Sequence, residues 1–97
     1  MNTEAFSGAF FFDPADPIYH CHFPGNPVVP GSLVVHAFFE ACSETGWDPV
    51  SMNMENFRFR RFFPPGKYSY QMKEGKRGID CTLWDGADLL VTGRIVS

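Results

Sequence analysis

The feature that most constrains this chain is one segment with the apolar pattern of a buried helix, residues 31–45, which read GSLVVHAFFEACSET. Apolar side chains surround almost the whole of this helix, a pattern typical of a helix buried on most sides. Gly46 is the expected helix stop, because glycine readily adopts the left-handed conformation that ends helices. The polar residues of the helix are spaced four apart and so form one narrow stripe: Ser32, His36, Glu40 and Glu44. Such a stripe must face solvent, a partner or a site.

The segments on both sides of this helix have the pattern of β-strands. Prolines at 14 and 17 interrupt the first strand, and the three prolines and one glycine of residues 18–30 predict an irregular loop. One helix with about five strands predicts an α+β domain, a sheet wrapped around the helix, that spans residues 1–97. The strands are expected over residues 5–12, 52–63, 67–73, 79–84 and 88–96.

Three local patterns refine the predicted strands. Residues 74–78 are expected to join two of them, and Asp85-Gly86 is a tight hairpin signal before the last strand. In the second strand, phenylalanine and arginine alternate from Phe57 to Arg60. Successive side chains of a strand point to opposite faces, so the phenylalanines are expected to face the core and the arginines to face outward.

Composition excludes several classes of protein. A net charge of −3 gives no case for a nucleic-acid partner. No apolar run is long enough to span a membrane, and the N-terminus lacks the features of a signal peptide. Three cysteines without a CxxC pair predict free thiols in a reducing compartment, so we expect a cytoplasmic protein. Because a chain of 97 residues buries a limited core, association with a second copy is also expected.

Residues 22–37, HFPGNPVVPGSLVVHA, carry a specific resemblance. A His-Phe-Pro-Gly motif, a second Pro-Gly and then a helix resemble the active-site segment of the FabZ- and FabA-like 3-hydroxyacyl-acyl-carrier-protein dehydratases. The segments MENFRFRRFFPPG and DLLVTGRIV resemble later strands of that family, so the resemblance covers residues 5–97. It implies a hot-dog fold, an acyl thioester of carrier protein or coenzyme A as substrate, no cofactor, and a site shared across a homodimer or higher homo-oligomer.

The resemblance also implies residue roles. His22 matches the motif histidine and would be the base that removes the C2 proton, since imidazole titrates near neutral pH. The N–H of Gly31, at the free start of the helix, would bind the thioester carbonyl. The family has Glu or Asp fourteen residues after the motif histidine, where this chain has His36. An imidazolium can also donate a proton, so His36 is the candidate acid. The candidate substrate-binding residues are Phe23, Pro30, Ser32, Glu40, Arg58, Arg60 and Arg61.

Plainer interpretations stay open for each of these residues. His22 could tie down its loop, and His36 could be a polar residue of a dimer interface with Glu40 as its hydrogen-bond partner. The arginines of residues 58–61 could dock an acidic carrier or coenzyme A phosphates, or form an ordinary solvated strand face. Zinc is not expected, because residues 20 to 22 of an extended stretch alternate in direction.

Three functions fit this pattern. The first is dehydration of a 3-hydroxyacyl thioester to the trans-2-enoyl form, in fatty-acid or in polyene- or polyketide-type synthesis. The second is a thioesterase, in which Glu40 or His36 directs water at the carbonyl. The third is an acyl-thioester-binding subunit without catalysis, which the missing acidic residue at position 36 favours. Fold alone does not choose among them.

Overall fold

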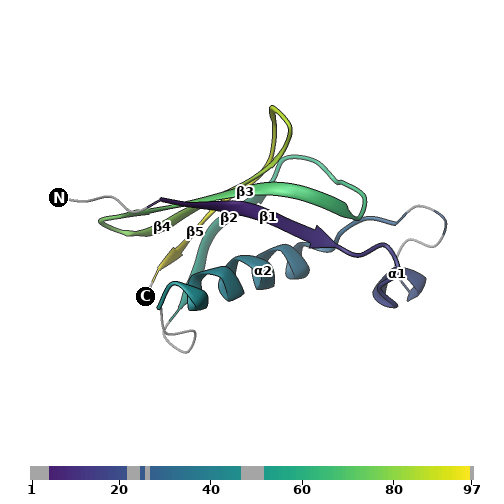
Figure 1. Ribbon diagram of the computed structural model, residues 1–97, viewed down its shortest axis with the longest axis horizontal. Helices are drawn as coiled ribbons and strands as arrows, with labels where there is room; N and C mark the ends of the chain where they lie inside the picture. Colours follow the sequence, from purple (N-terminus) through teal and green to yellow (C-terminus); the bar gives the residue numbers. More distant parts are fainter. Residues whose placement is uncertain (1–4, 22–24, 26, 47–51, 97) are drawn as a thin grey trace.

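The computed structural model describes residues 5–21, 25, 27–46 and 52–96, with the side chains of His20 and Cys21 excepted. A five-stranded antiparallel sheet in the order β1-β3-β4-β5-β2 lies over one long helix, α2 (Figure 1). This confirms the predicted α+β hot-dog architecture. The elements, in chain order, are β1 (Ala5–Phe12), α1 (Ile18–Cys21), α2 (Gly31–Glu44), β2 (Asn53–Phe59), β3 (Gly66–Gly75), β4 (Gly78–Asp85) and β5 (Asp88–Val96).

Helix α2 begins at the predicted residue, ends one residue before the predicted end, and is buried on one face, not on most sides as its apolar pattern predicts. Its buried residues, Val34, Phe38, Ala41 and Cys42, recur at helical spacing and pack under the sheet. The polar stripe is exposed along its whole length. Gly46 has φ +103° just after the helix, the left-handed conformation expected of a glycine stop. Among the described residues, no helix is long and apolar enough to cross a membrane.

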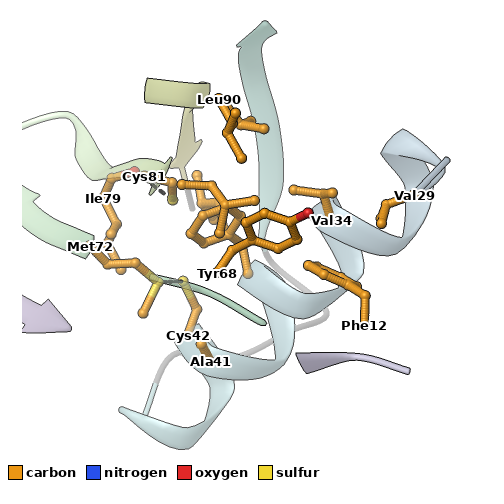
Figure 2. Close-up of a cluster of buried hydrophobic side chains, with 14 of the residues drawn as sticks. Phe12, Val29, Val34, Ala41, Cys42, Tyr68, Met72, Ile79, Cys81 and Leu90 are labelled. Atoms are coloured by element: carbon orange, nitrogen blue, oxygen red, sulfur yellow. Dashed lines mark hydrogen bonds between the residues drawn. The ribbon is translucent and has the colours of Figure 1, made fainter. Parts of the chain in front are cut away.

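The core is aromatic at its centre. Phe38 is fully buried, and its ring meets Phe10 edge-on at a centroid distance of 5.0 Å, with Tyr70 at 6.2 Å and Phe57 at 6.0 Å. These geometries are the offset and edge-to-face arrangements that aromatic pairs prefer. Around this centre lie buried residues from α2 and from strands β1, β3, β4 and β5, several of which are labelled in Figure 2.

The two cysteines whose side chains are described belong to this core. Cys42 and Cys81 are free and buried, and the thiol of Cys42 lies 3.8 Å from the sulfur of Met72 (Figure 2). Burial raises the pKa of the Cys42 thiol to about 11, and burial also raises the pKa of Cys81. Both thiols therefore act as packing groups.

Strand β2 is shorter than predicted and contains a β-bulge. It ends at Phe59, and Arg60 and Arg61 form a bend, although the Arg60 N–H still donates to the Leu90 carbonyl at 2.8 Å. Asn56 and Phe57 together oppose Gly93, because the pairing jumps from Glu55–Arg94 to Arg58–Thr92. Asn56 has φ +55°, a value that non-glycine residues adopt rarely and asparagine more easily than most.

The bulge shifts the side-chain alternation of β2 by one position. Phe57 and Phe59 come to the face that meets α2, and the Phe57 ring lies directly over Gly93, where a β-carbon would be 2.5 Å from the ring. The predicted orientation of these phenylalanines is therefore correct, although 41% of Phe59 is exposed at the end of this edge strand.

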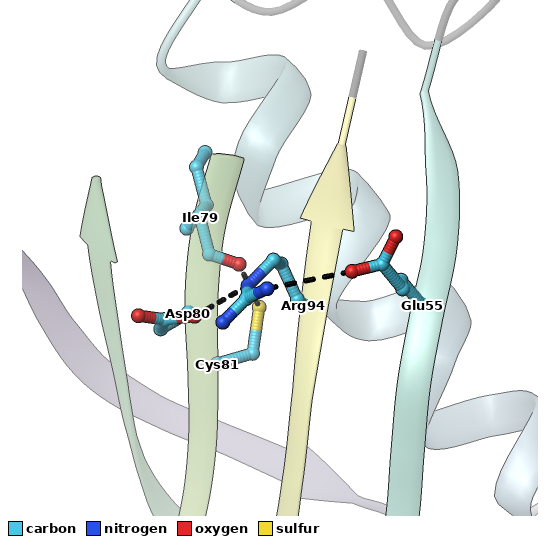
Figure 3. Close-up of polar contacts among 5 residues, drawn as sticks. All are labelled: Glu55, Ile79, Asp80, Cys81 and Arg94. Atoms are coloured by element: carbon cyan, nitrogen blue, oxygen red, sulfur yellow. Dashed lines mark hydrogen bonds and ion pairs between the residues drawn. The ribbon is translucent and has the colours of Figure 1, made fainter. Parts of the chain in front are cut away.

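The opposite face of the sheet carries polar cross-strand contacts. The guanidinium of Arg94 on β5 donates to Asp80 on β4 at 2.9 Å and lies 3.4 Å from Glu55 on β2 (Figure 3). The hydrogen bond to Asp80, more than any other contact, raises the pKa of Arg94. Oppositely charged neighbours across a sheet stabilise the pairing of their strands.

The segment after β1 differs from the predicted irregular loop, because it begins with the short helix α1. An Asp16 side-chain oxygen accepts the N–H of Ile18 at 3.0 Å, and the Asp16 carbonyl accepts that of Tyr19 at 3.1 Å. Asp16 thus supplies a capping oxygen two residues before α1, and Pro17, which has no N–H, directly precedes the first helical residue, a combination that favours a helix start. The prolines of this segment therefore begin a helical turn at one end of the loop.

The two hairpins are tighter than predicted. Strands β3 and β4 run to a Gly75–Gly78 pair, and only Lys76 and Arg77 connect them. In the last hairpin Asp85 pairs with Asp88, so the loop consists of Gly86 and Ala87. Gly86 has φ +60°, as the first loop position of such turns requires.

Candidate active site

The exposed stripe of α2 contains the predicted pair of His36 and Glu40. The His36 Nε2 lies 2.5 Å from the Glu40 Oε1, and the two side chains are 68% and 65% exposed. The contact spans one helical turn, as the spacing of four residues predicts. It orients the imidazole through Nε2, so that Nδ1 is the ring nitrogen left for a second partner.

A groove of about 490 Å³ runs beside this pair, between β1 and α2. Its apolar lining includes Phe10, Leu33 and Ala37, and its polar lining includes His36, Glu40, Glu44, Asp13 and Asp16. The lining is therefore a mixture of polar and apolar groups, and the groove is open to solvent along α2 from Leu33 to Glu44.

Tyr19 of α1 also lines this groove. The residue is 7% exposed, and within the described part of the chain its buried hydroxyl has no hydrogen-bond partner. Burial, and then the charges of Asp16 and Asp13, raise the pKa of Tyr19, so its phenol stays protonated at neutral pH. Sequence reasoning misses Tyr19, because it predicts an irregular loop where the structure has α1 and its Asp-Pro start.

The start of α2 presents backbone donors. The Pro30 carbonyl accepts the N–H groups of Leu33 at 3.1 Å and Val34 at 3.4 Å, and Pro30 itself, the N-cap, offers no side-chain acceptor. Within the described residues, the N–H groups of Gly31 and Ser32 therefore have no acceptor. A second, almost wholly apolar cavity of about 280 Å³ adjoins this helix end and includes Gly31, Phe59 and Arg61 in its lining.

The predicted site residues fall into three groups. His22 and Phe23 lie outside the described residues. Pro30, Gly31 and Ser32 form the start of α2, with His36 and Glu40 following along the same helix. The third group is the arginines, which the structure separates. Arg60 and Arg61 lie in the bend after β2, and the Arg61 guanidinium is 3.8 Å from the Asp88 carboxylate. Arg58 lines a depression on the outer face of the sheet together with Arg94.

A metal-binding arrangement is not found in the described part of the chain, where no three His, Cys, Asp or Glu side chains lie close enough to hold an ion. The side chains of residues 20–22, which include two histidines and a cysteine, are outside this statement. The described residues thus offer three features: the close contact of His36 with Glu40, the protonated phenol of Tyr19, and backbone N–H groups at the start of α2 that have no acceptor among these residues.

Comparisons with known proteins identify the family to which the chain belongs. A model of the ApeI-like family, described as ApeI dehydratase, matches residues 2–77. The chain is also similar to 3-hydroxyacyl-[acyl-carrier-protein] dehydratase FabZ of several bacteria. The protein of Ehrlichia chaffeensis is 37% identical over 57 residues, which are 53% of this chain and 40% of that protein. The protein of Symbiobacterium thermophilum is 29% identical over 75 residues, 66% of this chain and 53% of that protein. The matched regions therefore span about half or less of these relatives' length.

Proposed function

Because the chain belongs to the ApeI-like dehydratase family, we propose that it dehydrates a 3-hydroxyacyl thioester to the trans-2-enoyl form. The proposal treats residues 1–97 as one hot-dog domain and places the reaction in fatty-acid or in polyene- or polyketide-type synthesis. The observation that carries it is the combination of the family match with Gly31 and Ser32 N–H groups that have no acceptor among the described residues and an accessible His36 further along α2. The similarity to 3-hydroxyacyl-acyl-carrier-protein dehydratases supports an acyl carrier protein as the bearer of the substrate; coenzyme A is the alternative.

The elimination needs three groups, and the chain offers a candidate for each. The N–H of Gly31 would donate to the thioester carbonyl, which acidifies the C2–H bond by stabilising the negative charge that develops on oxygen. His22 would accept the C2 proton. His36 would donate a proton to the departing 3-hydroxyl, which leaves as water, and Glu40 would hold its Nε2 so that Nδ1 faces the substrate. No electron is gained or lost, so no redox cofactor or metal is required.

A second copy would complete this site. The His36–Glu40 pair is open to solvent in one protomer, and proton transfer groups work better where water is excluded. Strand β2 is an edge of the sheet, and Met54, Phe59 and Phe62 are exposed on it and just beyond it. An unpaired edge with exposed apolar side chains favours association. We therefore propose a homodimer or higher homo-oligomer, and light scattering that shows a monomer at micromolar concentration would contradict it.

The carrier or coenzyme A would dock beside the start of α2. Arg60 and Arg61 are exposed there, next to the apolar cavity at Gly31, and their charges suit an acidic carrier or phosphate groups. Arg58 points to the other face of the sheet and would act only at longer range. Exchange of Arg60 and Arg61 for glutamate should raise KM for a carrier-bound substrate and leave KM for a short pantetheine thioester unchanged. We propose a cytoplasmic protein without a nucleic-acid or membrane partner, in keeping with its composition.

The central experiment assays 3-hydroxybutyryl and crotonyl carrier thioesters. Appearance or loss of the enoyl absorbance reports dehydration or hydration, and release of free thiol reports hydrolysis. His22→Ala should abolish the reaction in a folded protein. His36→Gln should lower the rate by about 10²-fold, whereas His36→Glu should retain it, because a carboxylic acid can also donate the proton.

Other outcomes of this assay distinguish the remaining functions. Thiol release without an enoyl signal would identify a thioesterase and overturn the proposal. Silence in both signals, with acyl-thioester binding retained, would identify a binding subunit. A gain of dehydration in His36→Glu alone would mean that the natural site is disabled at position 36.

A further inference from the structure

The ring of Phe59 lies against the first residue of α2. A β-carbon added at Gly31 would be 3.0 Å from the Phe59 Cζ and 3.3 Å and 3.5 Å from its two Cε atoms. Any larger residue at position 31 would therefore displace the ring by a few tenths of an ångström. Phe59 keeps this contact although 41% of the residue is exposed to solvent. One side of the ring thus covers backbone, and the other side faces outward.

Backbone pairing fixes the ring in this place. The bulge at Asn56 and Phe57 sets the alternation of β2, and Phe59 then pairs with Val91, which is fully buried under the sheet. The hydrogen bond from the Arg60 N–H to the Leu90 carbonyl holds the next residue. Because the strand is tied on both sides of Phe59, the sheet register sets the face on which its ring lies.

The ring lies beside a helix start that has polar groups in need of an acceptor. The N–H groups of Gly31 and Ser32 lack one among the described residues, and the cavity that Gly31 lines is apolar. An aspartate or serine in place of Phe59 could accept a hydrogen bond from these groups and would compete with a substrate carbonyl. A phenyl ring cannot accept in that way, yet it removes water from one side of the donors, which strengthens their interaction with a charge that develops beside them.

We propose that Phe59 is a positioning residue for the reaction proposed above: it shields the N–H groups at the start of α2 from water and forms the wall against which the thioester carbonyl is placed. Gly31 and Phe59 act as one unit, since the absent side chain at position 31 is what lets the ring approach. This assignment rests on the proposed function for its role in catalysis, but the shielding itself is a property of the protein without substrate.

Amide hydrogen exchange on the free protein tests the shielding. Phe59→Ala should speed the exchange of the Gly31 and Ser32 amides by tenfold or more, and Phe59→Leu should give an intermediate rate. Phe62→Ala is the matched control, because Phe62 lines the same cavity and is 83% exposed but is not among the atoms nearest the Gly31 β-carbon position. Equal exchange rates in wild type and in a folded Phe59→Ala variant would overturn the proposal.

Steady-state kinetics then tests the role in catalysis. Phe59→Ala should lower kcat by about tenfold with a smaller change in KM, and Gly31→Ala should have less effect in the Phe59→Ala background than in wild type, because the ring that it displaces is already gone. If wild type shows no dehydration, the proposed function fails while the exchange result stands. If wild type is active and Phe59→Ala has the same kcat, the positioning role fails alone.

Discussion

The two faces of helix α2 differ in how completely other residues of this chain cover them. On the buried face, Val34, Phe38 and Cys42 are each fully covered by residues of the same chain. On the other face, His36 and Glu40 touch each other and are otherwise about two-thirds exposed. The contacts of the first face are complete when the chain folds, whereas the side chains of the second face can still bind a substrate or a second copy. Stability and activity should therefore respond to different substitutions within one helix.

The largest effect is expected from the centre of the buried face. Phe38→Ala removes a fully buried ring that contacts three other aromatic residues, and such truncations cost about 3–5 kcal/mol through lost transfer energy and the cavity left behind. Urea unfolding followed by circular dichroism measures this loss. Phe11→Ala is the control, because Phe11 on β1 is 64% exposed. Equal losses in the two variants would show that the faces are not separated as described.

A pH change should affect the buried face next. Burial raises the pKa of the Cys42 thiol to about 11, whereas in the unfolded chain it titrates at about 8.5. Between these two pKa values the Cys42 thiol ionises in the unfolded chain but not in the folded one. Its contribution to the free energy of unfolding is therefore fully present below about pH 8 and is lost as pH rises. Between pH 7 and 10 the loss from Cys42 should be about 2 kcal/mol.

The unfolding free energy at the two pH values, compared between wild type and Cys42→Ala, isolates this contribution. The variant should start lower at pH 7, because it leaves a small cavity, but lose less on the way to pH 10. Parallel losses in the two proteins would place the alkaline sensitivity elsewhere, with Cys81 as the first alternative, since burial raises its pKa as well.

The smallest effect on stability is expected from the exposed face. Glu40→Gln removes the charge from a solvent-exposed contact between residues four apart, which contributes only a few tenths of a kcal/mol. His36→Gln should be as mild in unfolding experiments. A change in melting temperature of more than a few degrees in either variant would mean that this face has structural partners that a single protomer does not reveal.

Much of the fold could be predicted from the sequence, because its elements follow from local patterns. The near-continuous apolar segment of α2 and the alternation in the strands depend on side chains close in sequence, and their bounds agree with prediction to within a few residues. The bulge at Asn56 could not be predicted in the same way, because it departs from the regular period of its segment and only the pairing with β5 decides it. The short helix at Ile18 does have a local signal, Asp16 followed by Pro17, which the prolines of the predicted loop obscure.

The candidate site was less predictable for a different reason. The contact of His36 with Glu40 lies within one helical turn and could be predicted from spacing alone. The approach of Phe59 to Gly31 and the position of Tyr19 on the groove join segments far apart in the chain, so no local pattern indicates them. The roles of His22, Phe23 and the other site residues remain predictions that the mutants above test.

The bulge in β2 gives this strand one residue more than its partner, so the effect of a deletion depends on where in the strand it falls. Substitution of Asn56 by glycine keeps the count of residues and suits the positive φ at this position. Deletion of one residue between Glu55 and Arg58 would give Gly93 a single partner and restore a regular ladder, with the Glu55–Arg94 and Arg58–Thr92 pairs and the face of each remaining side chain retained. A deletion elsewhere in β2 would move every side chain on one side of it to the opposite face. In natural or designed variants of this domain, the loss of a residue from β2 should therefore fall between Glu55 and Arg58.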